Sequence, residues 1–210
     1  GLPKILFRGT ELDADLMARL GRRRLPTLGS YWNDAGLSGG EGYKVAGDNP
    51  KPAPWMQGWP NLRKPRGSRK SLGFKIDPGK LPALNQPRLE RARDPEIYAP
   101  PVLILPVSVQ YNRDKGVGLI SWKRVAYSES FFGYSTARCP GSNARDLTHY
   151  LHVLTASSLF IYHALMTSAQ FGVERDTLQK EDADSFPIVP LEWLNPKQIE
   201  AVRKLSADIE

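Results

Sequence analysis

The stretch LTHYLHVLTASSLFIYHALMTSAQFGVERDTLQKEDADSFPIVPL, residues 147–191, decides the fold expected of this 210-residue chain. Apolar residues recur in its first half at helical spacing, which predicts one long amphipathic helix over residues 145–170. Gly172 is a natural end for that helix. A short charged segment follows, and residues 186–190 are predicted to be extended, as in a strand. We expect the apolar stripe to pack in the core; it consists of Leu147, Leu151, Leu154, Leu159, Tyr162, Leu165 and Met166.

A second helix is predicted near the start of the chain, over residues 10–24. Thr10 is placed to cap it, and Asp13 follows three positions later, as in a capping box with a shorter acid. Its apolar face consists of Leu12, Leu16 and Leu20.

A third helix is predicted from Asn195 to the C-terminus. Asn195 suits the N-cap, Pro196 the first helical position, and Gln198 the capping-box position. Its apolar face consists of Ile199, Val202, Leu205 and Ile209.

The middle of the chain predicts strands. Residues 102–105 form a continuous apolar run, as in a buried strand, and residues 116–127 are rich in branched and aromatic side chains. Residues 30–60 are rich in Gly, Pro and aromatics and are interpreted as loops and short strands. We therefore expect an α/β fold with a mixed or antiparallel sheet and helices towards the C-terminus. The expected organisation is an N-terminal helical segment, 1–24, a main domain, 25–194, and a C-terminal helix, 195–210.

Positive charge is concentrated in the first part of the chain. Residues 1–125 contain 22 Lys and Arg against 11 Asp and Glu, whereas residues 126–210 contain 7 against 11. A basic front of this kind favours a polyanionic partner, although solvated surface charge is the alternative. The densest segment, residues 61–93, has ten Lys and Arg against two acids, and Gly and Pro interrupt any helix in it.

Two basic groups are candidate contacts to nucleic-acid phosphates. The first lies in the densest segment and consists of Arg63, Lys64, Arg66, Arg69, Lys70 and Lys75. The second ends the N-terminal helix and consists of Arg22, Arg23 and Arg24. A cationic triplet at a helix C-terminus also complements the helix dipole, so a purely structural role is an alternative for the second group.

Several function classes find little support. No run of 18 apolar residues is present, so no membrane span is expected. The single Cys139 excludes an internal disulfide and fits a reducing cytoplasm. The glycine-rich residues 39–43 lack the Lys-Ser/Thr ending of a P-loop. His149 and His152 would need further ligands to hold a metal, so packing or hydrogen bonding is the favoured role for them and for His163.

Three landmarks, in order, carry a resemblance to a known family. The first is WNDAGLSGGEGY, residues 32–43, followed by WMQGWPNL, residues 55–62. The second is YAPPVLI, residues 98–104, and the third is the closing segment quoted at the start. Together they resemble the target-recognition (specificity) domain of bacterial N6-adenine DNA methyltransferases of restriction–modification systems, either type I-like or fused restriction–methylation enzymes.

The resemblance implies a sequence-specific module for double-stranded DNA that works with a catalytic methyltransferase domain or subunit. S-adenosylmethionine would bind to that catalytic part. This chain has neither its glycine-rich cofactor loop nor its Asn/Asp-Pro-Pro-Tyr/Phe motif, so we expect no cofactor and no activity from the chain alone. The absence of an initiator Met at Gly1 favours a piece of a longer protein. Base-reading residues vary within such families, so the resemblance names none.

Two other function classes remain open. In a protein-interaction or scaffold domain, aromatic loops would form the interface, with Trp32, Tyr43, Trp55 and Trp59 as candidates. An independent hydrolase would need an assembled catalytic set, and the sequence offers none. A Cys139 nucleophile would need a His base and an orienting group, so a structural role is favoured for this residue.

Overall fold

An antiparallel sheet lies at the centre of the computed structural model, which describes residues 9–22, 24–63, 76–108, 118–168 and 177–209. The strand order is β1-β8-β5-β6, and all three neighbouring pairs are antiparallel. The strands are β1 (Ser38–Glu41), β8 (Phe131–Ser135), β5 (Val102–Pro106) and β6 (Leu119–Ser121). The α/β expectation is confirmed in its antiparallel form.

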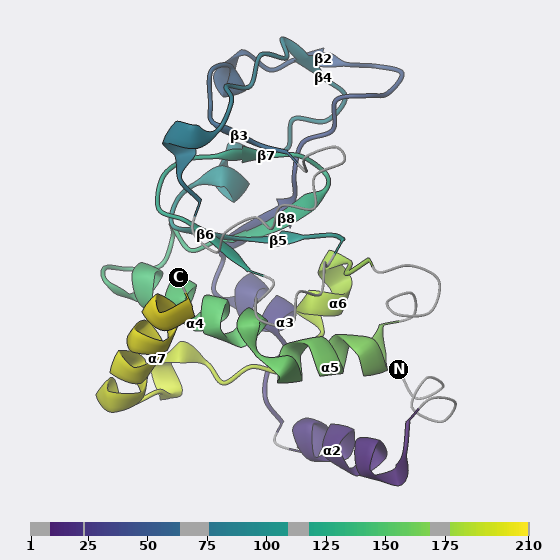
Figure 1. The fold of residues 1–210 in the computed structure, drawn as a ribbon, viewed down its shortest axis with the longest axis vertical. Coiled ribbons are helices and arrows are strands. Elements are labelled where there is room, and N and C mark those ends of the chain that lie inside the picture. Colours follow the sequence, from purple (N-terminus) through teal and green to yellow (C-terminus); the bar gives the residue numbers. More distant parts are fainter. Residues whose placement is uncertain (1–8, 23, 64–75, 109–117, 169–176, 210) are drawn as a thin grey trace.

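Helices cover one face of this sheet (Figure 1). The layer consists of α3 (Leu28–Asp34), α4 (Asn143–Ala156), α5 (Ser158–Thr167) and α6 (Lys180–Asp184), with the short helix η4 (Leu191–Trp193) beside α4. Two more helices lie farther out: α7 (Pro196–Ile209) packs on α4, and α2 (Glu11–Arg22) lies beyond α5, at the end of the molecule away from the sheet. None of the described helices is long and apolar enough to cross a bilayer.

Short strands and loops cover the opposite face, and we call this part the upper layer (Figure 1). It contains the described residues 42–63, 76–98 and 122–128. Two small strand pairs organise it: β2 (Lys51–Pro52) with β4 (Arg88–Leu89), antiparallel, and β3 (Asn61–Leu62) with β7 (Ala126–Tyr127), parallel. Three single-turn helices join them: η1 (Pro54–Met56), η2 (Pro78–Lys80) and η3 (Pro95–Tyr98).

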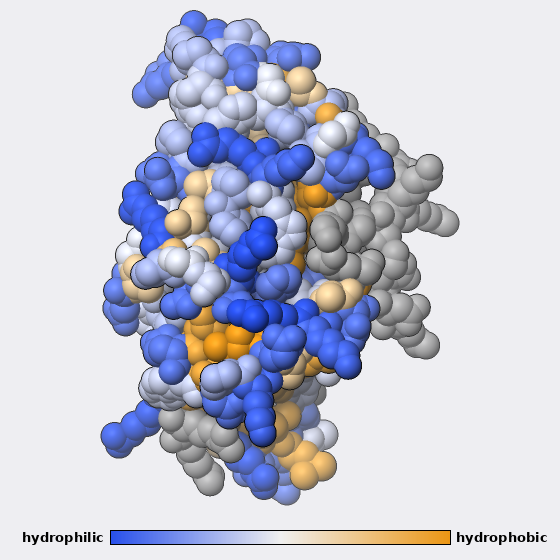
Figure 2. All heavy atoms as spheres, turned by 90° about the vertical axis from the view of Figure 1, so that its left-hand side faces the viewer, coloured by the Kyte–Doolittle hydropathy of each residue, from blue (hydrophilic) through white to orange (hydrophobic). Residues whose placement is uncertain are grey.

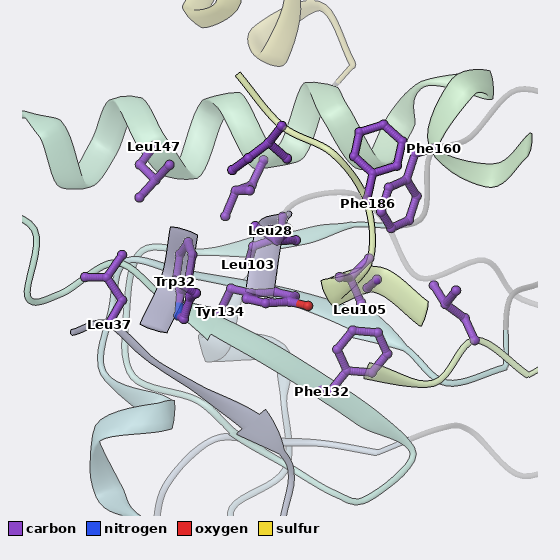
Figure 3. Close-up of a cluster of buried hydrophobic side chains, with 14 of the residues drawn as sticks. Leu28, Trp32, Leu37, Leu103, Leu105, Phe132, Tyr134, Leu147, Phe160 and Phe186 are labelled. Carbon is purple, nitrogen blue, oxygen red and sulfur yellow. The ribbon is translucent and has the colours of Figure 1, made fainter. Parts of the chain in front are cut away.

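The central sheet has a buried core on each face, as the alternation of its side chains requires. Leu103 and Leu105 of β5 belong to the core under the helices, where they pack with Phe132 (Figure 3). Val102 and Ile104 of the same strand belong to the core under the upper layer. A strand buried on both faces has no polar positions, which explains the continuous apolar run in its sequence.

The single long helix predicted over residues 145–170 is wrong, because the chain breaks it at Ser157. Ser157 is extended (φ −74°, ψ 142°); its hydroxyl donates to the Leu154 carbonyl at 2.6 Å and accepts from the Phe160 amide at 3.2 Å. One side chain thus ends α4 and begins α5, in the manner of serines that compete with helical hydrogen bonds.

The break also changes which residues of the predicted stripe are buried, because α5 begins with a new helical phase. Leu147 and Leu151 of α4 are fully buried. In α5, Leu159 and Leu165 remain 37% and 38% exposed. Phe160, His163 and Ala164 fill the core in their place. Gly172 lies outside the described residues.

Two other parts differ from the sequence-based expectation. Residues 28–34, predicted as loop from residue 30 onward, form α3, capped by the Thr27 hydroxyl, which accepts from the Ser30 amide. One helical turn separates its two buried residues, Leu28 and Trp32, which is too short a pattern to show periodicity. Residues 186–190 form a single bridge to Thr27 in place of a strand.

Both terminal helices begin as predicted, but their apolar faces are not buried as a stripe. The Thr10 amide and hydroxyl both donate to Asp13, and Asn195 and Gln198 bond each other's backbone amides reciprocally. Leu12 is nevertheless 81% exposed and Leu205 is 51% exposed. The buried residue of α7 is Ser206 instead.

Candidate nucleic-acid interface

Most of the predicted phosphate-contacting cations lie outside the described residues. This holds for Arg23 and for Lys64, Arg66, Arg69, Lys70 and Lys75; the Arg22 side chain is also outside them. The structure places the remaining two, Arg24 and Arg63, far apart. Arg24 follows α2 at one end of the molecule, whereas Arg63 follows β3 on the other side of the central sheet (Figure 1). The two predicted groups therefore do not form one patch.

The parallel pair β3–β7 positions the cations of the upper layer. In its register Asn61 faces Ala126 and Leu62 faces Tyr127. The Ala126 amide also donates to the Pro60 carbonyl at 2.8 Å. Arg124 therefore precedes the pair at one end and Arg63 follows it at the other.

A buried hydrogen-bond chain fixes the stem of Arg63. Its Nε donates to the Tyr43 hydroxyl at 3.1 Å, and that hydroxyl donates to Asn61 Oδ1 at 2.7 Å. Tyr43 is fully buried and Asn61 is 3% exposed. Arg63 itself is exposed and, among the described residues, forms no ion pair. Its guanidinium is thus held at the surface with its charge directed to solvent.

Aromatic rings of the upper layer pack into a cluster, which we call the aromatic floor; it consists of Trp55, Trp59, Tyr98 and Tyr127. Trp55 and Trp59 meet edge to face with ring centroids 5.2 Å apart, and both contact Tyr98. Tyr98 packs on Tyr127 at 4.8 Å. Burial raises the pKa of both tyrosines, so they stay neutral and donate to the carbonyls of Ala92 and Ile97. The floor is therefore fixed by packing and by hydrogen bonds.

The turn between β6 and β7 contributes two exposed cations, Lys123 and Arg124. The Ser121 hydroxyl donates to the Lys123 carbonyl at 2.7 Å and closes the turn. The Arg124 guanidinium lies over the ring of Trp59, 4.9 Å from its centroid. Sequence reasoning missed both cations because residues 116–127 read as a strand. Their signal was the adjacent basic pair, which interrupts that apolar stretch.

The cations of the upper layer are largely without acidic partners. Arg93 pairs with Glu41 and Lys80 with Asp77. Within the described residues no ion pair involves the others, which we call the upper-layer cations: Lys44, Lys51, Arg63, Arg88, Arg91, Lys123 and Arg124. By contrast, carboxylates hold Lys180 and Arg203 on the helical side. Figure 2 shows one side face of the molecule, where hydrophilic residues predominate around smaller apolar patches.

Gly133 lets the upper layer lie close to the sheet. Gly40 of β1 faces Gly133 of β8. A Cβ added to Gly133 would lie 2.4 Å from the Tyr127 hydroxyl oxygen. Gly39 and Gly40 thus belong to a strand, in agreement with the rejection of a P-loop at residues 39–43.

The histidines of the C-terminal half have packing and hydrogen-bonding roles, as favoured from the sequence. The Ser206 hydroxyl lies 2.8 Å from His149 Nδ1 and 2.9 Å from His152 Nδ1. Together with the ion pair between Arg203 and Asp146, this contact holds α7 on α4. No group of three potential metal ligands occurs within the described residues. Burial, followed by the Glu192 charge, raises the pKa of the partly buried Cys139 thiol, which disfavours a thiolate nucleophile.

The interface predicted for a scaffold domain is only partly available. Trp32 is 2% exposed and Tyr43 is fully buried, so neither can form a loop contact. Trp55 and Trp59 are half-buried. In comparisons with known proteins, no family model matches the chain, and no curated protein matches it significantly.

Proposed function

We propose that this chain is a module for binding double-stranded DNA, of the target-recognition type found in N6-adenine DNA methyltransferases of restriction–modification systems. The upper layer would face the duplex. Methyl transfer, and the S-adenosylmethionine it requires, would belong to a catalytic domain or subunit outside this chain. The target-recognition part of the proposal rests on the sequence resemblance, and the choice of the upper layer rests on the structure.

The observation that carries the proposal is the position of Arg63 and Arg124 at the two ends of β3–β7. The pairing of Asn61 with Ala126 and of Leu62 with Tyr127 places Arg124 before this short ladder and Arg63 after it. Both side chains are exposed. Cations held at both ends of one strand pair suit contacts to a duplex, where phosphate contacts set the register of a protein on DNA.

A double substitution tests the proposal. Arg63→Ala with Lys123→Ala, two exposed cations of the upper layer, should weaken binding to every duplex and reduce the salt slope, because each phosphate contact contributes about 0.9 to the slope of log K against log salt. Two lost contacts therefore predict a decrease of about 1.8 in fluorescence anisotropy titrations over a range of salt concentrations.

The matched control is Lys197→Ala with Lys204→Ala. These two lysines are exposed on α7 and form no ion pair within the described residues. Their replacement removes the same amount of positive charge as the test variant. The control should leave the slope unchanged. An equal effect of both double variants would show that only net charge matters, and salt-insensitive binding by the parent chain would contradict the proposal. Contacts from the cations of residues 64–75 stay a prediction that the same titration can address.

A protein-interaction role remains a second candidate because of α2. Leu12 is 81% exposed and Leu16 is 40% exposed on this helix. The Tyr162 hydroxyl of α5 donates a hydrogen bond to Asp13 of α2. An apolar face of this kind is typical of a protein contact. It is compatible with DNA binding, because α2 and the upper layer lie at opposite ends of the molecule (Figure 1).

A further inference from the structure

Arg124 differs from the other upper-layer cations in how its guanidinium is held. The group lies over Trp59, and the Trp59 ring is in turn held edge to face against Trp55 and Tyr98. The Trp59 backbone is also fixed, since its amide donates to Met56 and its carbonyl accepts from Leu84. The platform under Arg124 therefore has little freedom to move.

The backbone on each side of Arg124 is also fixed. On one side the Ser121 hydroxyl closes the turn at Lys123, at 2.7 Å. On the other, Val125 is fully buried and the Ala126 amide joins the ladder to Pro60. Arg124 is thus an exposed side chain on a rigid stem, with its charged group held over an aromatic ring.

The contact with Trp59 leaves the N–H donors of the guanidinium available. The charged group is attracted to the face of the ring, and that contact occupies none of its five N–H donors in a conventional hydrogen bond. Arg124 forms no ion pair within the described residues. The planar fork matches two acceptors side by side, and in a DNA major groove the commonest such pair is O6 and N7 of guanine.

The neighbouring cations are less suited to reading a base. Lys123 has no planar fork, and a point charge of this kind is sufficient for a phosphate. Arg63 already uses its Nε to bond the Tyr43 hydroxyl. Arg145 lies over Trp122, 5.4 Å from the ring centroid, but it extends from α4 in the helical layer.

We propose that Arg124 reads the edge of a guanine in the duplex that this chain binds, with Trp59 holding the guanidinium in place. The inference rests on the proposed DNA-binding function and deepens it by assigning one base contact to one residue. A phosphate oxygen pair is the other acceptor that the same fork could meet, and it must be distinguished by experiment.

The test begins with the duplex that the chain itself selects from a random pool. Affinities are then measured for that duplex, for every single base-pair change in it, and for versions in which each guanine is replaced by 7-deazaguanine. That base lacks the N7 acceptor but leaves Watson–Crick pairing and the backbone intact. We expect one guanine whose replacement by another base weakens binding about 5- to 150-fold, the range for a bidentate base contact.

Arg124→Ala should abolish the discrimination at that one guanine and make the variant indifferent to 7-deazaguanine there. Arg124→Lys should reduce that discrimination without abolishing it, because lysine keeps the charge and can still donate to guanine but lacks the planar fork. Arg145→Ala is the matched control, since it removes another arginine stacked on a tryptophan, and it should leave that discrimination intact. Melting curves establish that each variant is folded.

Two results would overturn the inference in distinguishable ways. If Arg124→Ala weakens all duplexes equally and lowers the salt slope by about one unit, Arg124 contacts a phosphate. The proposed DNA binding would then be retained, and the proposed contact between Arg124 and a guanine would be rejected. If the parent chain shows no salt-dependent duplex binding, the proposed function fails, and the assignment of Arg124 fails with it.

Discussion

Replacing Gly133 with alanine should both destabilise the chain and weaken DNA binding, because the upper layer packs directly on this position. Gly133 lies in the middle of β8, between Gly40 of β1 and Ile104 of β5. An added Cβ would lie 2.4 Å from the Tyr127 hydroxyl oxygen and 2.8 Å from Tyr127 Cζ. That hydroxyl donates to the Ile97 carbonyl at 2.9 Å, so the ring cannot move away without losing the bond.

The expected cost follows from the size of the clash. Overpacking a well-packed core by one methyl group costs about 1–3 kcal/mol. For a chain of this length that lowers the melting temperature by about 2–12 °C. Tyr127 belongs to β7, level with Leu62 of β3, so its displacement also shifts the strand pair that positions Arg63 and Arg124. We therefore expect weaker duplex binding even at temperatures where the variant is fully folded.

The assay combines thermal melting, followed by circular dichroism, with anisotropy titrations of a duplex well below the melting temperature. Gly21→Ala is the control, because a Cβ at Gly21 in α2 meets nothing within 4 Å. Alanine in a helix is favoured over glycine by about 1 kcal/mol, so this variant should melt at the same temperature or higher. Tyr127→Phe removes both the closest atom and the bond to Ile97, so the double variant should lose less stability than the sum of the two single variants. Melting of Gly133→Ala at the parent temperature would refute the reasoning.

Two further predictions concern the helical layer. Leu151→Ala should lower the free energy of unfolding by about 2–5 kcal/mol, the range for a fully buried leucine. Leu154→Ala should lower it less, because Leu154 is only partly buried. Equal losses in chemical denaturation would contradict the assigned burial. Burial lowers the pKa of His163, so the folded state favours the neutral ring and should lose stability as pH falls through about 6.5. His163→Gln should therefore flatten the decline in unfolding free energy between about pH 8 and 5, and an unchanged slope would exclude His163 as a contributor.

The elements that the sequence predicted best are those whose signals are local. The capping boxes at Thr10 and Asn195 involve residues three positions apart, and both helices begin where these signals place them. The apolar run at residues 102–105 identified the central strand for the same reason. The pattern of one segment cannot show which other segment packs against its apolar face. The leucines of α2 have the spacing of a buried stripe, yet Leu12 stays exposed.

The candidate site was harder to predict because it depends on contacts between distant segments. Arg63 was identified from the density of basic residues around it. Arg124 was missed, since its position beside Trp59 follows from the pairing of β3 with β7, more than sixty positions apart in the chain. The sequence offered Arg24 and Arg63 as members of two separate basic groups, and the structure places them on opposite sides of the central sheet, with Arg24 after α2 and Arg63 after β3.

This separation bears on the role of the arginines that end the N-terminal helix. Residues 1–125 contain more Lys and Arg than Asp and Glu, but the described cations do not gather on one side of the molecule. Arg24 lies beside the C-terminal end of α2, where cations complement the helix dipole. A duplex lying on the upper layer would have the sheet and the helices between it and Arg24 (Figure 1). The proposed interface therefore leaves Arg24 with the structural role, and the cations proposed to meet DNA are those of the upper layer.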